Sequence, residues 1–205
     1  MRLRETDAFQ ALLLEPVRIH GHLCPGQVLG IRMALLGLKE TGIEDPKGKD
    51  KKGLIVFAEM DRCATDAIQS VTGCSLGQRT LKFMDYGKMA ATFLNLGTGK
   101  AIRIVAREEA REKAKAYFPE IKDKYLCQME AYKIMPDDEL FSFESVRVDI
   151  PQKDMPGKPR NRVRCGSCGE YVQDRREVML NGKALCKACA YGKYYTSQEM
   201  NLDEQ

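Results

Sequence analysis

The hydrophobic pattern of the first 150 residues alternates between helical and strand-like segments. From residue 25 to residue 41, apolar side chains recur at three- and four-residue intervals, which predicts a long helix. Within it, Gly26, Gly30 and Ala34 form a stripe of small residues that lets a second backbone approach closely. The run GLIVFA at residues 53–58 is apolar throughout and predicts a buried strand.

The pattern continues with further elements. A helix is predicted to begin after Asp61, the expected N-cap, and to carry Cys63 in its first turn. Strands are predicted over 80–84, 89–94, 101–106 and 146–150, and helices over 108–118 and 121–135. The turn sequences DYGK and GTGK join the middle strands into an expected meander. This mixture predicts an α+β fold, with a mixed or antiparallel sheet and helices in the core domain.

Residues 151–162, PQKDMPGKPRNR, interrupt the pattern. They include three prolines and one large apolar residue, Met155, which is typical of an extended linker. The sequence therefore predicts an α+β core domain over 1–150, a linker over 151–162 and a small domain over 163–205. Such a linker would allow the small domain to pack on its own core or on a neighbour's.

Composition narrows the class of protein. The chain has 205 residues and is 43% hydrophobic, enough to bury a core, but it has no apolar run of membrane-spanning length. The apolar segment 11–14 is too short for a signal peptide, so we expect a cytoplasmic protein with no membrane attachment. In that compartment, eight cysteines indicate metal ligation or thiol chemistry before disulfides. The net charge of +4 permits nucleic-acid binding without requiring it.

Four cysteines in the last third of the chain have the spacing of a zinc ribbon. They form two CxxC pairs separated by seventeen residues: Cys165, Cys168, Cys186 and Cys189. Asn181 and Gly182 supply a hairpin turn between the pairs. The alternative, a pair of redox-active dithiols, is disfavoured because no thioredoxin-like βαβ pattern is present. We expect a structural zinc ion, because a closed four-cysteine site leaves no position for a substrate.

Basic residues surround this motif. They are Arg160, Arg162, Arg164, Arg175, Arg176, Lys183 and Lys187. A solvated surface explains them, and so does a surface for phosphate, nucleic acid or an acidic partner. The sequence leaves both explanations open.

A second group of ligand types lies near the N-terminus. Both histidines of the chain, His20 and His22, precede Cys24 by four and two residues. In an extended segment these three side chains would project to one side and form a candidate site for a transition metal. Pro25 would occupy the first helical turn, which places Cys24 near an N-cap where a thiolate is favoured.

Other residues could join that group. Cys63 begins the next helix, with Asp66 nearby as a ligand or proton acceptor, and Cys74 lies in the loop TGCSLG. Tyr86 and Lys88 belong to a predicted turn, but both are competent proton donors. The candidate catalytic residues are Cys24, Cys63 and Lys88. Buried structural cysteines and hydrogen-bonded core histidines are the alternatives, and Cys127, on an ordinary helix, is expected to be structural.

Three blocks of sequence resemble one known family. The blocks HGHLCPGQVLGIRMALLGLKETG, EMDRCATDAIQSVTGCSLG and LKFMDYGKMAATF are similar to successive motifs of the family of formylmethanofuran dehydrogenase E subunits. The match covers His20 to the end of the core, and the four-cysteine module resembles the ribbon that many members carry. One departure is the stretch 77–80, GQRT, where members often have a glycine-asparagine segment.

The resemblance implies an α+β core, a homodimer and a cleft that holds a second metal or thiol site. Transferred to this sequence, it nominates His20, His22, Cys24, Cys63 and Cys74, with Asp66, Tyr86 and Lys88 around them. The family takes its name from an accessory polypeptide of a molybdenum or tungsten enzyme, whose chemistry belongs to other polypeptides of that enzyme.

We therefore expect a metal-binding protein with a structural zinc ion and a second transition metal in the core, the leading ligands being His22, Cys24 and Cys63. It would act as an enzyme or as an accessory subunit of one-carbon or redox metabolism, with partner enzyme subunits. The alternative is a nucleic-acid-binding or regulatory protein whose ribbon makes the contact and whose core serves for dimerisation.

Overall fold

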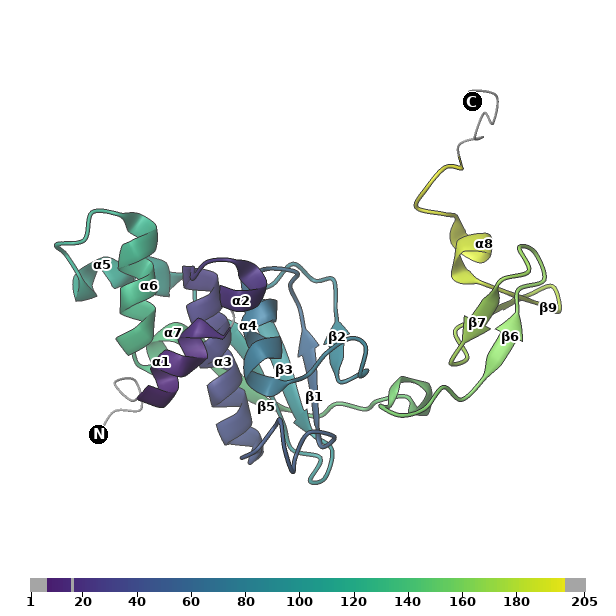
Figure 1. The fold of residues 1–205 in the computed structure, drawn as a ribbon, viewed down its shortest axis with the longest axis horizontal. Coiled ribbons are helices and arrows are strands. Elements are labelled where there is room, and N and C mark those ends of the chain that lie inside the picture. The colour runs from purple at the N-terminus through teal and green to yellow at the C-terminus, as the bar shows by residue number, and fades with distance from the viewer. Residues whose placement is uncertain (1–6, 16, 198–205) are drawn as a thin grey trace. The chain divides into compact units, whose positions relative to one another are not determined.

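The computed structural model describes residues 7–15 and 17–197, and its contacts divide the chain into two compact units, Met1–Ile150 and Pro151–Gln205 (Figure 1). None of the helices in the described part of the chain combines the length and the apolar character that crossing a bilayer requires.

The first unit is built on a five-stranded sheet in the order β2-β1-β3-β4-β5. Its strands are β1 (Leu54–Ala58), β2 (Leu81–Phe83), β3 (Ala90–Asn95), β4 (Ala101–Ala106) and β5 (Phe141–Val146). β1 and β2 run parallel, and the other neighbouring strands are antiparallel. Alternate strand residues such as Val56, Phe93 and Ile104 enter the hydrophobic core.

Seven helices in the described part of this unit lie beside the sheet (Figure 1). They are α1 (Asp7–Leu14), α2 (Val17–His20), α3 (Pro25–Thr41), α4 (Cys63–Thr72), α5 (Glu109–Tyr117), α6 (Lys124–Ile134) and α7 (Asp137–Leu140). α3 is buried along most of its length and packs against α4, α6, β3 and β4. Its small residues make this possible: a Cβ on Gly30 would lie 2.4 Å from the carbonyl oxygen of Ala64 in α4. The predicted small-residue stripe is thus a helix-packing surface.

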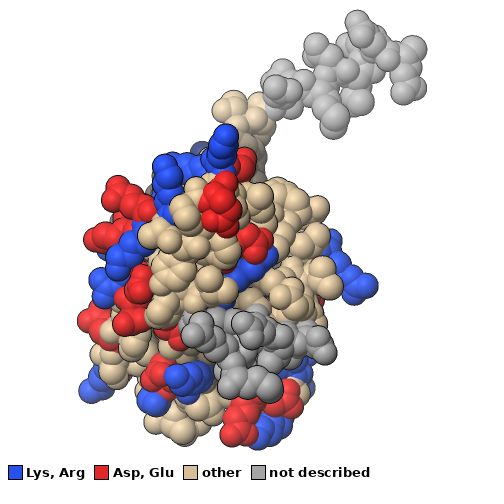
Figure 2. Space-filling model, turned by 90° about the vertical axis from the view of Figure 1, so that its left-hand side faces the viewer, with Lys and Arg blue, Asp and Glu red and all other residues tan. Residues whose placement is uncertain are grey.

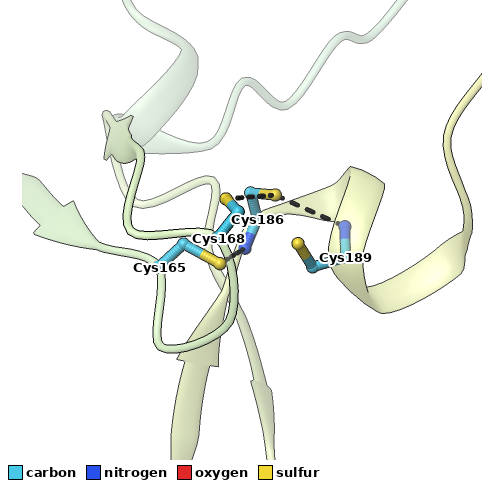
Figure 3. Close-up of side chains that lie close together, drawn as sticks. All are labelled: Cys165, Cys168, Cys186 and Cys189. Atoms are coloured by element: carbon cyan, nitrogen blue, oxygen red, sulfur yellow. Dashed lines mark hydrogen bonds between the residues drawn. The ribbon is translucent and has the colours of Figure 1, made fainter. Parts of the chain in front are cut away.

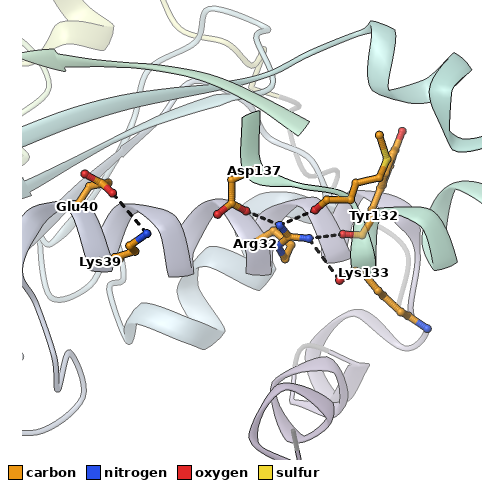
Figure 4. Close-up of polar contacts among 7 residues, drawn as sticks. Arg32, Lys39, Glu40, Tyr132, Lys133 and Asp137 are labelled. Carbon is orange, nitrogen blue, oxygen red and sulfur yellow. Dashed lines mark hydrogen bonds and ion pairs between the residues drawn. The ribbon is translucent and has the colours of Figure 1, made fainter. Parts of the chain in front are cut away.

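A buried arginine joins α3 to α6 and α7 (Figure 4). Arg32 donates hydrogen bonds to the backbone carbonyls of Tyr132 and Met135, at 2.7 and 2.9 Å, and pairs with the carboxylate of Asp137. These carbonyls belong to the C-terminal end of α6, where no intrahelical donor remains. Arg32 therefore caps α6 while fixing it to α3.

The predicted α+β class is confirmed, but the expected strand order is wrong. The expected meander fails at its first strand, because β2 pairs in parallel with β1, after the crossover helix α4, instead of beside β3. The closing strand is expected over 146–150, whereas β5 ends at Val146. The apolar alternation at 146–150 follows the strand and does not extend it.

The second unit contains two short hairpins and one helix. They are β6 (Arg162–Arg164) with β7 (Tyr171–Gln173), β8 (Val178–Leu180) with β9 (Lys183–Leu185), and α8 (Lys187–Tyr191). The segment expected as a linker holds a short 3₁₀ helix, Gln152–Asp154. Its Asp154 pairs with Arg176 at 3.1 Å, which ties this segment to the hairpins that follow. Residues 198–205 of the expected small domain lie outside the described residues.

Candidate metal centres

The four cysteines of the second unit converge on one point (Figure 3). Cys165 and Cys168 follow β6, Cys186 is the N-cap of α8, and Cys189 lies within α8. Their sulfur atoms all lie within 4.8 Å of one another. The Sγ atoms of Cys168 and Cys186 are 3.9 Å apart. A tetrahedral ion with metal–sulfur bonds of about 2.3 Å needs sulfur atoms about 3.8 Å apart. The donor set and its spacing fit a zinc-ribbon site.

Turn geometry brings the two cysteine pairs together. Asn181 and Gly182 both have positive φ, at 49° and 75°, and form the predicted two-residue hairpin turn between β8 and β9. β9 then meets the turn between Cys165 and Cys168, where the N–H of Gly166 donates to the carbonyl of Ala184 at 2.8 Å. A hairpin turn between the two CxxC pairs thus accounts for the convergence of the four cysteines.

Backbone donors prepare one thiol of this site for ionisation. Hydrogen bonds from the N–H groups of Cys168, Cys186 and Ser167 lower the pKa of Cys165 to about 6. For Cys168, a backbone hydrogen bond from Glu170 acts in the same direction, but burial and the neighbouring thiols prevail and raise its pKa to about 12. Thiolates crowded in this way repel one another, and a bound cation removes that repulsion.

A second group of ligand atoms lies in the first unit. His20, Cys24 and Cys63 each offer an atom within 4.8 Å of the other two. His20 ends α2, Cys24 is the N-cap of α3, and Cys63 begins α4. Gly26 keeps the cysteines close, because a Cβ at this position would lie 3.3 Å from the Cβ of Cys63 and 3.8 Å from the Sγ of Cys24.

Asp66 orients the imidazole of this group. Its carboxylate lies 2.9 Å from Nδ1 of His20, so that Nδ1 is the donor and Nε2 is left as the nitrogen available to a metal. The expected trio contained His22 in place of His20. The segment is not extended as expected, because α2 ends at His20 and Gly21 then turns the chain with φ of 89°. His22 is exposed, with its ring centre 5.0 Å from that of His20.

The electrostatics of this site favour the neutral form of the Cys63 thiol when no cation is bound. Burial raises the pKa of Cys63, and the neighbouring Cys24 raises it further. Asp66 acts in the same direction through its negative charge. A positively charged ion bound beside Cys63 would promote the ionisation of its thiol.

Some predicted site residues lie elsewhere. Cys74 follows the C-terminal end of α4, opposite the end that carries Cys63, and its buried thiol faces the carbonyl of Leu54 at 3.8 Å. The departure from the family pattern at 77–80 belongs to this same end. The structure thus brings neither Cys74 nor that loop to the His20 group. Cys127 is buried and its thiol faces the carbonyls of Ala114 and Phe118.

Tyr86 and Lys88 lie at the same edge of the sheet as Cys63. The N–H of Lys88 donates to the carbonyl of Glu59, just after β1, at 3.0 Å. Both side chains are exposed, and the Lys88 Nζ lies 5.9 Å from the centre of the Tyr86 ring. They lie on the surface, beside the segment that leads from β1 to α4.

Sequence reasoning missed Gln27. It lies in the first turn of α3, and its N–H donates to the carbonyl of Cys24 at 3.0 Å. Its side chain is fully buried, and neither its amide oxygen nor its amide nitrogen has a hydrogen-bond partner. Side chains on a helix lean toward its N-terminus, so this amide covers the end of α3 that carries Cys24. The available signal was a lone polar residue within an apolar run.

A separate hollow of about 890 Å³ lies between α5 and α6. Charged residues of both signs line it, including Glu112 and Lys115, and Figure 2 shows acidic and basic side chains interspersed over the end of the first unit that carries these helices. None of the residues that line this hollow belongs to the group of His20, Cys24 and Cys63.

Comparisons with known proteins agree with this fold. The family model described as FmdE, molybdenum formylmethanofuran dehydrogenase operon, matches residues 19–142. A protein of Archaeoglobus fulgidus named probable S-adenosyl-L-methionine-binding protein is 30% identical over 90% of this chain. The chain spans about half of that relative's length, 53%.

A solved structure has the same fold. It is a tungsten formylmethanofuran dehydrogenase FmdE-like protein from Syntrophus aciditrophicus, with a TM-score of 0.62 and 20% sequence identity. The match covers 92% of this chain and 95% of that one.

Proposed function

The chain belongs to the FmdE family, and from that premise we propose that it is a metal-binding protein of one-carbon or redox metabolism with two different sites. The ribbon holds a structural zinc ion. The core holds a second transition-metal ion through His20, Cys24 and Cys63. The observation that carries the proposal is the approach of three ligand atoms, from α2, α3 and α4, to within 4.8 Å of one another.

The donor sets assign different roles to the two sites. Four thiolates saturate a tetrahedral ion, whereas one imidazole and two thiolates leave a position open for water or substrate. An ion bound there would supply a Lewis acid that polarises a carbonyl-type group or lowers the pKa of water. Asp66 orients the imidazole of His20, and Gln27 keeps a hydrogen-bonding amide at the covered end of α3.

Proton transfer would fall to groups at the rim of the core site. Lys88 and Tyr86 are exposed on the loop that leads from β2 to β3, at the same sheet edge as Cys63. Cys24 and Cys63 act as ligands, or as a neighbouring pair of thiols when no ion is bound. A thiol step between Cys63 and Cys74 is not part of this proposal, because α4 separates these residues.

The named relative supplies a ligand to test. The Archaeoglobus protein is described as a probable S-adenosyl-L-methionine-binding protein, and such a ligand carries a one-carbon group. Since this chain spans 53% of that protein, the ligand belongs in a binding screen and is not assigned to the core site. A homodimer and association with partner enzyme subunits in the cytoplasm are also proposed, from the family resemblance.

Metal content per chain tests the core site. We expect two ions per chain in protein purified without chelator and one ion in the His20→Ala, Cys24→Ala double variant. His22→Ala is the matched control, because this neighbouring histidine lies outside the ligand group, and it should keep two ions. One ion in both the unaltered protein and the double variant would refute the core metal site.

A second variant separates the two sites. Cys168→Ser should remove the ribbon ion and leave the core ion in place. If that variant lost both ions, the core would have no independent site. Elemental analysis of each preparation also identifies the metals, and zinc is the expected result for the ribbon.

A further inference from the structure

The part of the second unit that the structure describes is basic. Residues 151–197 contain ten Lys and Arg but four Asp and Glu, and the remaining residues of the unit, 198–205, add three acidic residues. Residues 151–197 thus carry an excess of six positive charges, of which four thiolates around a divalent ion offset two. This basic stretch is a candidate surface for an anionic partner.

One face of the first ribbon hairpin combines this charge with an aromatic ring. In the register of β6 and β7, Arg164 is opposite Tyr171, and strand alternation places Arg162 on the same face. The guanidinium of Arg162 lies 4.6 Å from the centre of the Tyr171 ring, and that tyrosine is 58% exposed. We call these three side chains the β6–β7 face.

The two arginines keep their charge available. Within the described residues, no carboxylate lies at ion-pair distance from Arg162 or Arg164; Arg164 donates to the backbone carbonyl of Gly169 at 3.1 Å. Arg176, on the turn that follows β7, differs from them. It pairs with Asp154 at 3.1 Å and with Asp174 at 3.6 Å, so its charge is already compensated.

We propose that the β6–β7 face binds single-stranded nucleic acid, with a base stacked on Tyr171 and the adjoining phosphates held by Arg162 and Arg164. An exposed aromatic ring beside uncompensated guanidinium groups is the combination that recognises unpaired bases on a phosphate backbone. An acidic protein as partner would contact the two arginines but would have no flat base to stack on the tyrosine ring. Paired bases in a duplex do not offer their faces to such a ring.

Fluorescence anisotropy tests this proposal on the full, metal-loaded chain. The probes are a labelled RNA of mixed sequence, the same sequence as single-stranded DNA, its duplex, and poly-glutamate; a length of about 15 nucleotides exceeds the site size of a small module. We expect binding to the single strands that weakens as salt rises, with weaker binding to the duplex and to poly-glutamate. The RNA and DNA arms show whether the sugar matters, and either single strand satisfies the proposal.

Variants distinguish stacking from general attraction of anions. Tyr171→Ala should weaken single-strand binding by about five-fold or more, while Tyr171→Phe, which keeps the ring, should bind nearly as the unaltered protein does. Arg162→Ala and Arg164→Ala should each reduce, by about one, the slope of the logarithm of the binding constant against the logarithm of the salt concentration. Arg176→Ala is the matched control and should change neither the affinity for the single strand nor its dependence on salt. The metal content of each variant shows whether its ribbon is intact.

Several results would overturn the proposal. One is absence of single-strand binding at low salt. Another is a Tyr171→Ala variant that binds as tightly as the unaltered protein. Equal losses in Arg176→Ala and Arg162→Ala, or poly-glutamate binding as tight as single-strand binding, would show a general anionic contact instead.

Discussion

At the scale of single residues, the core site depends on a carboxylate and an imidazole that the sequence separates by 46 positions. Asp66 fixes the ring of His20 and leaves Nε2 available, and Cys24 and Cys63 approach because Gly26 has no side chain between them. The same microenvironment disfavours an ionised Cys63 without a cation. The two metal sites also differ in their number of thiolate ligands, so we expect them to respond differently to protons.

We predict that acid releases the core ion before the ribbon ion. The pKa of Cys165 is lowered to about 6, so its thiolate contribution is present above that value and is lost as pH falls through it. The pKa values of Cys63 in the core and Cys168 in the ribbon are both raised, so protons compete with a metal at both sites, but the ribbon ion is held by four thiolates and the core ion by two. A chromogenic chelator should record two waves of release as pH falls from about 8 to about 5.

The His20→Ala, Cys24→Ala variant is the control, because it should show the later wave alone. A single wave in the unaltered protein, or loss of the ribbon ion first, would contradict the prediction.

The residues of the ribbon site could be predicted from spacing, but those of the core site could be predicted only in part. A CxxC pair brings its two thiolates to one ion through local backbone geometry, so the spacing alone identifies the ligands. The choice between His20 and His22 depends on where α2 ends and on the positive φ of Gly21, which the letters HGH do not reveal. Cys74 has the chemistry of a ligand, but a ten-residue helix separates it from the site.

At the scale of elements, the approach of α3 to α4 builds the core site. Cys24 is the N-cap of α3 and Cys63 begins α4, and the two helices lie close together where Gly30 faces Ala64. Hydrophobic periodicity predicted α3 with its observed bounds, since the pattern repeats over many turns. The pairing of β2 with β1 was missed because periodicity within a strand does not identify its neighbour, and β2 has three residues.

We predict that Gly30→Ala destabilises the first unit. Helix propensity alone would make this change favourable by about 1 kcal/mol. The added Cβ would lie 2.4 Å from a backbone oxygen, so α3 and α4 must separate, at a net cost of about 1–3 kcal/mol. Urea unfolding followed by circular dichroism measures the change, and core-site metal affinity should fall with it. A Gly30→Ala protein as stable as the unaltered one would show that the helices can separate freely.

At the scale of the whole molecule, the two units are stabilised by different means. The first buries large side chains such as Phe93, Tyr132 and Phe141 between sheet and helices. In the described part of the second unit, residues 151–197, Cys165 is the one hydrophobic residue that is buried. A module with so little buried apolar surface depends on its metal for folding. The two units meet at residue 150, and prolines and charges replace the apolar pattern of the sequence from there on.

Removal of metal should therefore unfold one unit and spare the other. We expect that excess chelator collapses the dispersed amide resonances of residues 162–191 while those of the sheet and of α3 to α6 remain. The core site should lose its ion with local shifts around Cys24 and Cys63, because its helices are held by packing. Cys165→Ser, which cannot complete the ribbon site, should reproduce the ribbon part of the spectrum without chelator. Dispersed ribbon resonances after chelation would mean that hairpin packing suffices, and loss of the core signals would mean that the first unit also folds around its ion.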